Sequence, residues 1–185
     1  RRSSDLRQIG RDHGPPMFFL GEDFEFSLKN EGVFDYTGVK QHFVGLKVKL
    51  RGRHQLFNAS LALATLEQLQ ERYPVDETVV REGLRTVSWP GRLEVMLDRP
   101  TVIIDGAHNG EGVRVLVDEL RNFRGRRIKL LFAAMEDKEW ELMLRALTKV
   151  VDEVIFTRVD MERSADPSEM TKKFSDKVAS RDIAD

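Results

Sequence analysis

The feature that most constrains the fold is a strand-like run that ends in a tight turn and leads at once into a helix. Residues 101–104 (Thr-Val-Ile-Ile) are all β-branched and mostly apolar, and an Asp-Gly pair follows them directly. From Val113 onward, apolar residues recur at i, i+3, i+4 and i+7, which is typical of an amphipathic helix. Open parallel α/β sheets bind ligands beyond the carboxyl ends of their strands, where Asp105, His108 and Asn109 fall. The segment therefore predicts a ligand-facing corner of an α/β fold.

The rest of the chain from residue 93 repeats this alternation. We expect strands over residues 93–97, 101–104, 128–134 and 153–159, and helices over residues 110–122, 137–150 and 167–180. Such alternation is typical of a mainly parallel, doubly wound sheet. Asp166 before Pro167 is a capping signal for the last helix. We expect no final strand after this helix, and hence a truncated C-terminal domain.

The first half of the chain has a different pattern. Short extended segments at residues 17–20, 24–28, 33–36 and about 42–50 are separated by turn signals, which predicts a small antiparallel meander. A helix tail and a loop are expected before it, over residues 1–16. Helices follow over about residues 54–72 and 76–87, and the Pro90-Gly91 turn is the best candidate for a domain boundary. We therefore expect two domains, residues 1–90 and 91–185.

The composition argues against several classes of function. The formal net charge of the 185 residues is −1, so the chain lacks the basic surface of a general nucleic-acid or membrane binder. The absence of cysteine removes disulfides, thiolate metal sites and cysteine nucleophiles, and it is consistent with a cytoplasmic protein. No apolar run approaches the ~20 residues that span a bilayer. We expect no nucleic-acid partner and no membrane association.

Three clusters of residues could carry chemistry. Asp105 could accept hydrogen bonds from a ribose diol, or it could be only a turn or cap residue. His108 could contact a phosphate or a base, although a lone histidine before a helix is more often structural. Arg92 follows a rigid turn and could present its guanidinium to phosphate oxygens, although a solvated arginine is the simpler interpretation.

The third cluster lies where the helix over residues 54–72 begins. His54 and Asn58 are four residues apart and share a face of this helix. Asn58 offers the donor and the acceptor needed to read a purine edge, whereas His54 and Gln55 could also merely cap the helix. The chain contains no phosphate loop of the Gly-x-x-x-x-Gly-Lys-Ser/Thr type and no His-Glu-x-x-His zinc motif, and we predict no metal ligands in it.

Taken together, the clusters resemble a known family. The matching motifs are Gly52-x-His54-Gln55-x-x-Asn58-Ala59, Pro90-Gly91-Arg92-x-Glu94 and Asp105-Gly106-Ala107-His108-Asn109. They are similar to motifs of the folylpolyglutamate synthase/dihydrofolate synthase family of the Mur ligase superfamily. Residues 131–139 and 163–167 resemble further segments of that family, so the resemblance covers roughly residues 40–170.

The resemblance implies an ATP-dependent amide ligase that adds L-glutamate to folates, to dihydropteroate or to both, through an acyl phosphate. It assigns nucleotide contacts to Asn58, Arg92, Asp105 and His108, and catalytic roles to Arg92 and His108. Arg92 and Mg²⁺ would stabilise charge on the transferring phosphoryl group. The implied fold is the tail of a central ATPase domain, a small antiparallel sheet plus helices, followed by a Rossmann-like, mainly parallel C-terminal ligase domain.

In that family the phosphate loop and most magnesium ligands lie upstream of the matching segment. We therefore expect a C-terminal fragment that is inactive by itself, from a parent ligase that is a cytoplasmic monomer. Two alternatives remain open. One is another Mur-type ligase that adds a different amino acid, and the other is a non-catalytic, flavodoxin-like binding domain in which Asp105 and His108 are turn residues.

Overall fold

The computed structural model describes residue 14, residues 16–30 and residues 32–183. The chain divides into two compact units, Arg1–Arg92 and Leu93–Asp185. The helix tail expected near the N-terminus falls mainly outside the described residues. None of the helices in the described ranges is long and apolar enough to cross a membrane.

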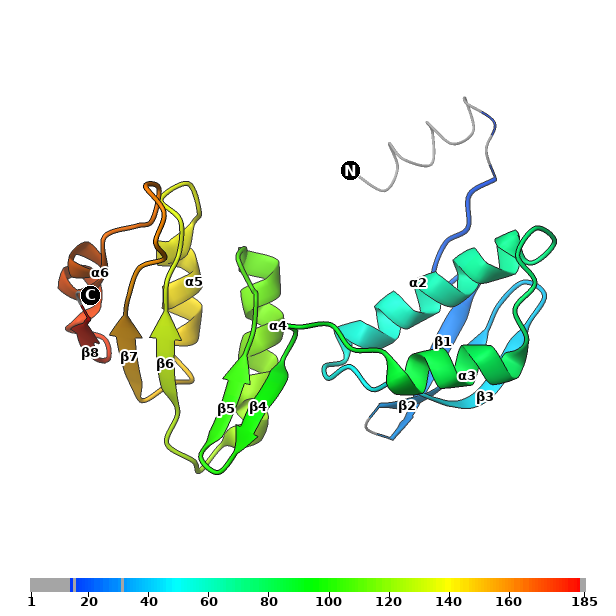
Figure 1. The fold of residues 1–185 in the computed structure, drawn as a ribbon, viewed down its shortest axis with the longest axis horizontal. Helices are drawn as coiled ribbons and strands as arrows, with labels where there is room; N and C mark the ends of the chain where they lie inside the picture. Colours follow the sequence, from blue (N-terminus) through cyan, green and yellow to red (C-terminus); the bar gives the residue numbers. More distant parts are fainter. Residues whose placement is uncertain (1–13, 15, 31, 184–185) are drawn as a thin grey trace. The chain divides into compact units, whose positions relative to one another are not determined.

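The first unit is a three-stranded antiparallel sheet with two helices (Figure 1). Its elements are β1 (Glu25–Asn30), β2 (Val33–Thr37), β3 (His42–Lys47), α2 (His54–Leu69) and α3 (Glu77–Thr86). The strands lie in sequence order, so the predicted meander is confirmed. Residues 17–20, expected to be a strand, form only an isolated bridge between Leu20 and Phe24. The core of the unit combines side chains of the sheet and of both helices, among them Phe34, Tyr36, Leu46, Leu56, Leu63 and Val80.

A buried carboxylate ties α2 to the loop between β2 and β3. Glu67 is only 3% exposed. It accepts hydrogen bonds from the backbone N–H groups of Val39 (3.2 Å), Lys40 (3.4 Å) and Gln41 (2.7 Å) and from the hydroxyl of Tyr36 (3.3 Å). Burial, reinforced by the charge of Glu67, raises the pKa of the Tyr36 hydroxyl, which therefore remains a donor. The loop is thus held by an acceptor that lies far along the chain.

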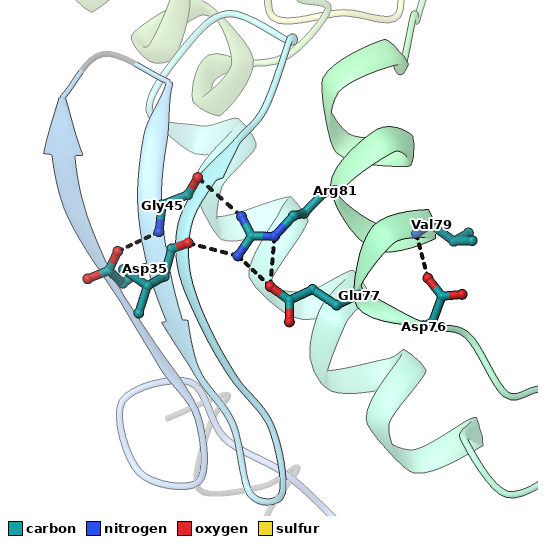
Figure 2. A network of polar contacts seen from close by, with 7 residues as sticks. Asp35, Gly45, Asp76, Glu77, Val79 and Arg81 are labelled. Carbon is teal, nitrogen blue, oxygen red and sulfur yellow. Dashed lines mark hydrogen bonds and ion pairs between the residues drawn. The ribbon is translucent and has the colours of Figure 1, made fainter.

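A second polar link joins α3 to β3 (Figure 2). The guanidinium of Arg81 donates to the carbonyl oxygens of Val44 (2.9 Å) and Gly45 (3.4 Å), and Glu77 holds it from within the helix (2.7 Å). On the other side, the N–H of Gly45 donates to Oδ1 of Asp35 on β2 (2.9 Å). These contacts connect three elements of the first unit through one short stretch of backbone.

The ionisation of Asp35 predicts how this link responds to acid. The N–H of Gly45 and the ammonium of Lys29 hold the pKa of Asp35 below its ordinary value of 3.8. The ionised carboxylate therefore stabilises the fold above this value, and its contribution disappears as the pH falls through the lower, folded-state pKa. We expect Asp35→Asn to lower the thermal unfolding midpoint at neutral pH and to flatten its fall in acid. The measurement is a series of thermal scans from neutral pH down through the pKa of Asp35. The stabilising role of ionised Asp35 would be contradicted if Asp35→Asn and the exposed control Asp98→Asn gave the same unfolding midpoint at every pH.

The second unit contains two separate sheets, and helices connect most of its strands along the sequence. Its strands are β4 (Glu94–Asp98), β5 (Thr101–Ile104), β6 (Lys129–Phe132), β7 (Glu153–Phe156) and β8 (Ala179–Asp182). Its helices are α4 (Gly110–Leu120), the short 3₁₀ helix η1 (Arg121–Phe123), α5 (Trp140–Leu147) and α6 (Pro167–Phe174). The strands β6, β7 and β8 are parallel, and α4, α5 and α6 contribute to one core with β6 and β7. The predicted α/β fold with a parallel ligase-type domain is confirmed.

Two details of the predicted sheet are wrong. A final strand does exist, because β8 pairs in parallel with β7, with Ser180 opposite Val154, and α6 ends at Phe174. The sequence of β8, Ala-Ser-Arg-Asp, has no apolar alternation, so its backbone pairing leaves no periodic signal. The strand at residues 101–104 does not join the parallel sheet. It forms an antiparallel hairpin with β4, since a two-residue connection permits only antiparallel pairing.

Candidate functional site

A hollow in the first unit lies beside the first turn of α2. Its volume is about 320 Å³, within the range of about 300–1,000 Å³ common for small-molecule sites. The lining residues are Leu50, His54, Gln55, Asn58, Trp89 and Arg92. The hollow therefore brings together Asn58 and Arg92, two of the residues that the sequence singled out.

The start of α2 places its polar side chains on one side. Gly52 has φ +99°, a backbone conformation that suits glycine, and the helix begins two residues later. His54 and Asn58 then lie one turn apart and both line the hollow, as their spacing predicted. The alternative in which His54 and Gln55 cap the helix is wrong. Arg53 occupies the N-cap position and makes no side-chain cap bond. The side chain of Gln55 bonds to the side chains of His54 and Asn58 instead of to the backbone at the start of the helix.

Gln55 is the buried member of the polar cluster formed by His54, Gln55 and Asn58. It is 5% exposed, and its Oε1 accepts a hydrogen bond from Nδ2 of Asn58 (3.1 Å). Its Nε2 lies 2.9 Å from Nε2 of His54. Three side chains from one helical turn are thus joined in a chain of hydrogen bonds. Asn58, the most exposed member, retains donor and acceptor capacity toward the hollow.

Two further lining residues come from the segment after α3. Trp89 is 63% exposed, although it is large and apolar, and it lines the same hollow. Gly91 adopts φ +69°, and this turn brings the exposed side chain of Arg92 to the hollow. An indole face, an amide and a guanidinium therefore border one space. Sequence reasoning did not assign a role to Trp89, although a large aromatic residue directly before a Pro-Gly turn was a usable signal.

Asp105 shapes the start of the second unit. Its Oδ2 accepts from the N–H of Leu93 (2.9 Å) and its Oδ1 from the N–H of Ala107 (2.9 Å). Leu93 has φ +48°, a left-handed conformation that costs roughly 1–3 kcal/mol for such a residue. Asp105 is therefore a turn residue that holds this strained backbone. The cap of α4 is Asn109 instead, whose Oδ1 accepts from the N–H of Gly112 (2.8 Å).

His108 lies three residues after Asp105 in the turn between β5 and α4. Its Nδ1 is 2.9 Å from the carbonyl oxygen of Gly106, so the bond places the ring proton on Nδ1. The ring is exposed, and Nε2 remains as a potential acceptor. Asp105 and His108 belong to the second unit, whereas Asn58 and Arg92 line the hollow of the first.

Two further segments of the second unit meet beyond the ends of β6 and β7. The N–H of Glu136 donates to the carbonyl oxygen of Arg163 (2.9 Å). Asp137 pairs with Lys138 (3.1 Å) and with Arg163 (3.8 Å). The hydrogen bond from Lys138 is the main cause that lowers the pKa of Asp137, and Arg163 adds to it. Across the parts of the chain that the structure describes, no group of three or more His, Asp or Glu side chains could hold a metal ion.

Comparison with known proteins decides the family. Residues 91–184, half of the chain, match the family described as "Mur ligase, glutamate ligase domain". The chain belongs to this Mur ligase family. The predicted resemblance to folylpolyglutamate synthases and dihydrofolate synthases within the Mur ligases is also confirmed by individual relatives.

One relative of this Mur ligase chain is the dihydrofolate synthase/folylpolyglutamate synthase of Bacillus subtilis. It is 31% identical over 162 residues, which are 83% of this chain and 35% of the relative. The folylpolyglutamate synthase of Mycobacterium tuberculosis, solved with ADP and AMPPCP, is 28% identical with a TM-score of 0.84 over 97% of this chain and 43% of that one. That of Thermotoga maritima is 33% identical with a TM-score of 0.81 over 98% of this chain and 44% of that one. The chain thus spans less than half the length of these relatives.

Proposed function

We propose that this Mur ligase chain is part of an ATP-dependent enzyme that joins L-glutamate to a folate, to dihydropteroate or to both. The Bacillus subtilis relative carries both activities in its name, and the Mycobacterium tuberculosis enzyme binds ADP and AMPPCP, which supports the nucleotide. In this proposal residues 1–90 are the end of a central ATPase domain and residues 91–185 the ligase domain. The enzyme is a monomer of the cytoplasm.

The hollow beside α2 is the observation that carries the nucleotide part of the proposal. An asparagine amide can accept from the amino group of adenine and donate to the neighbouring ring nitrogen, as Asn58 would do here. The exposed indole of Trp89 offers a stacking face, and stacking of a base on an aromatic ring is worth about 1–3 kcal/mol. The guanidinium of Arg92 matches the geometry of phosphate oxygens. The residues present therefore fit a purine nucleotide.

The proposed reaction has two steps. The γ-phosphoryl group of ATP passes to the substrate carboxylate, which leaves ADP and an acyl phosphate. The amine of glutamate then attacks the acyl carbon, phosphate departs, and an amide forms with loss of a proton. Arg92 would offset negative charge on the phosphate oxygens in the first step.

The second unit would contribute through the turn between β5 and α4. Each carboxylate oxygen of Asp105 accepts one backbone N–H and keeps capacity for another donor, which suits ribose hydroxyls. His108 would present Nε2 to the nucleotide. Within the described residues no cluster of three or more His, Asp or Glu side chains could hold a metal ion, and Mg²⁺ beside a nucleotide is usually held by one or two carboxylates together with the phosphates. That the magnesium ligands lie mostly outside this chain stays a prediction.

Kinetics of the full-length ligase test this assignment at Asn58. We expect Asn58→Ala to raise the KM for ATP by about 5- to 100-fold, because one bidentate base contact is worth about 1–3 kcal/mol. The kcat at saturating ATP should change much less, since the base contact is equal in the ground and transition states. Gln68→Ala, on an exposed position of the same helix, is the matched control.

Product analysis tests the reaction itself. Mass spectrometry should show glutamate added to dihydropteroate or to a tetrahydrofolate only when ATP is present. Addition of a different amino acid would favour another Mur-type ligase. Absence of any ATP turnover would favour a binding domain instead.

A further inference from the structure

We propose that Gln55 is a positioning residue that fixes the amide orientation of Asn58 and so makes the hollow select adenine over guanine nucleotides. The inference rests on the proposed function, because it concerns the base of the same nucleotide. It starts from one buried polar side chain, since Gln55 lines the hollow and is only 5% exposed. Burial of an amide is costly unless both of its ends are hydrogen-bonded.

Both ends of the Gln55 amide have a neighbour from the same helical turn. Its Nε2 lies 2.9 Å from Nε2 of His54, where the amide donates and the imidazole nitrogen accepts. This contact leaves Oε1 of Gln55 to face Asn58, and Nδ2 of Asn58 donates to it over 3.1 Å. The hydrogen-bond chain therefore assigns the two ends of the Asn58 amide. If the amide of Asn58 turned over, two carbonyl oxygens would face each other.

The fixed orientation has a consequence for the base. One N–H of Asn58 is engaged by Gln55, so Oδ1 and the second N–H remain for a ligand. Adenine presents an amino donor beside a ring-nitrogen acceptor, which this pair of groups satisfies together. Guanine presents two acceptors on the corresponding edge, so Oδ1 of Asn58 would meet an oxygen or a ring nitrogen and stay unpaired. A rotating amide could instead turn its donors toward guanine.

Three variants of the full-length ligase separate positioning from general stability. Gln55→Leu keeps a side chain of similar size but removes the oxygen that accepts from Nδ2 of Asn58. The ratio of kcat/KM for ATP over GTP should then fall by about 5- to 100-fold. Gln55→Glu keeps an acceptor for Nδ2 of Asn58 and should retain most of the ratio. Gln68→Leu is the exposed control on the same helix and should leave the ratio unchanged. Circular dichroism establishes that each variant is folded, and Gln55→Met replaces Gln55→Leu if the latter is not.

Asn58→Ala distinguishes failure of this inference from failure of the nucleotide assignment. If Asn58→Ala leaves the ATP to GTP ratio unchanged, the base contact in the proposed function is wrong. If Asn58→Ala lowers the ratio but Gln55→Leu does not, positioning by Gln55 is overturned while the base contact stands. The double variant should be no less selective than Asn58→Ala alone, because both changes remove one interaction. Equal losses from Gln55→Glu and Gln55→Leu would also overturn the inference.

Discussion

Replacement of Arg92 by alanine in the full-length ligase is expected to lower kcat for ATP-dependent glutamate addition by about 100- to 1,000-fold. A positioned hydrogen-bond donor that stabilises charge developing in the transition state typically contributes a factor of this size to kcat. Arg92 is the residue whose guanidinium borders the hollow. Binding of the substrates in the ground state should change less than kcat, because the charge on the transferring phosphoryl group is greatest in the transition state.

Two variants make this experiment specific. Arg92→Lys keeps the charge but loses the planar fork of donors, so we expect an intermediate rate. Arg85→Ala removes an exposed arginine of α3 that pairs with Glu82 on the same helix, and it should leave turnover unchanged. Initial rates of ADP release at saturating substrates give the comparison. Wild-type turnover in Arg92→Ala would remove the phosphate role from this residue.

Replacement of Glu67 by alanine is expected to produce the largest loss of stability, about 3 kcal/mol. The change leaves the hydroxyl of Tyr36 and three backbone N–H groups without their acceptor. Water can reach part of the loop, which limits the cost of each lost bond. The loss is still large beside the usual unfolding free energy of about 5–15 kcal/mol.

The matched variants distinguish the lost acceptor from the lost volume. Glu67→Gln keeps the shape and one acceptor oxygen, but its NH₂ group would face hydrogen-bond donors. We therefore expect a loss of stability smaller than that of Glu67→Ala. Gly38→Ala leaves the carboxylate in place, but its added methyl group would collide with the carboxylate of Glu67 and should also destabilise. Glu71→Ala, on an exposed position just beyond α2, is the control.

Urea unfolding followed by circular dichroism measures these losses. The buried indole of Trp140, in a Trp89→Phe background, reports the second unit and should show an unchanged transition. Equal stability of Glu67→Ala and Glu71→Ala would show that the buried contacts of Glu67 contribute nothing measurable.

The features that depend on neighbouring residues could be predicted from the sequence. The strand at residues 101–104 has the predicted bounds, and Asp166 caps α6 as its position before Pro167 indicated. The antiparallel meander and the shared face of His54 and Asn58 follow from turn residues and helical spacing in the same way. The motifs also identified the family, because they preserve residue types in a fixed local order.

Other features were decided only by the tertiary structure. Glu67 lies within α2 and belongs to a residue type that is seldom buried without a partner. Its partners are Tyr36 of β2 and the loop between β2 and β3. The hollow combines the first turn of α2 with Trp89 and Arg92 from the segment after α3. The strand β8 exists only because β7 offers it a backbone ladder. In each case the deciding hydrogen bond or contact joins residues distant in the chain, whereas propensity and periodicity describe only a residue and its sequence neighbours.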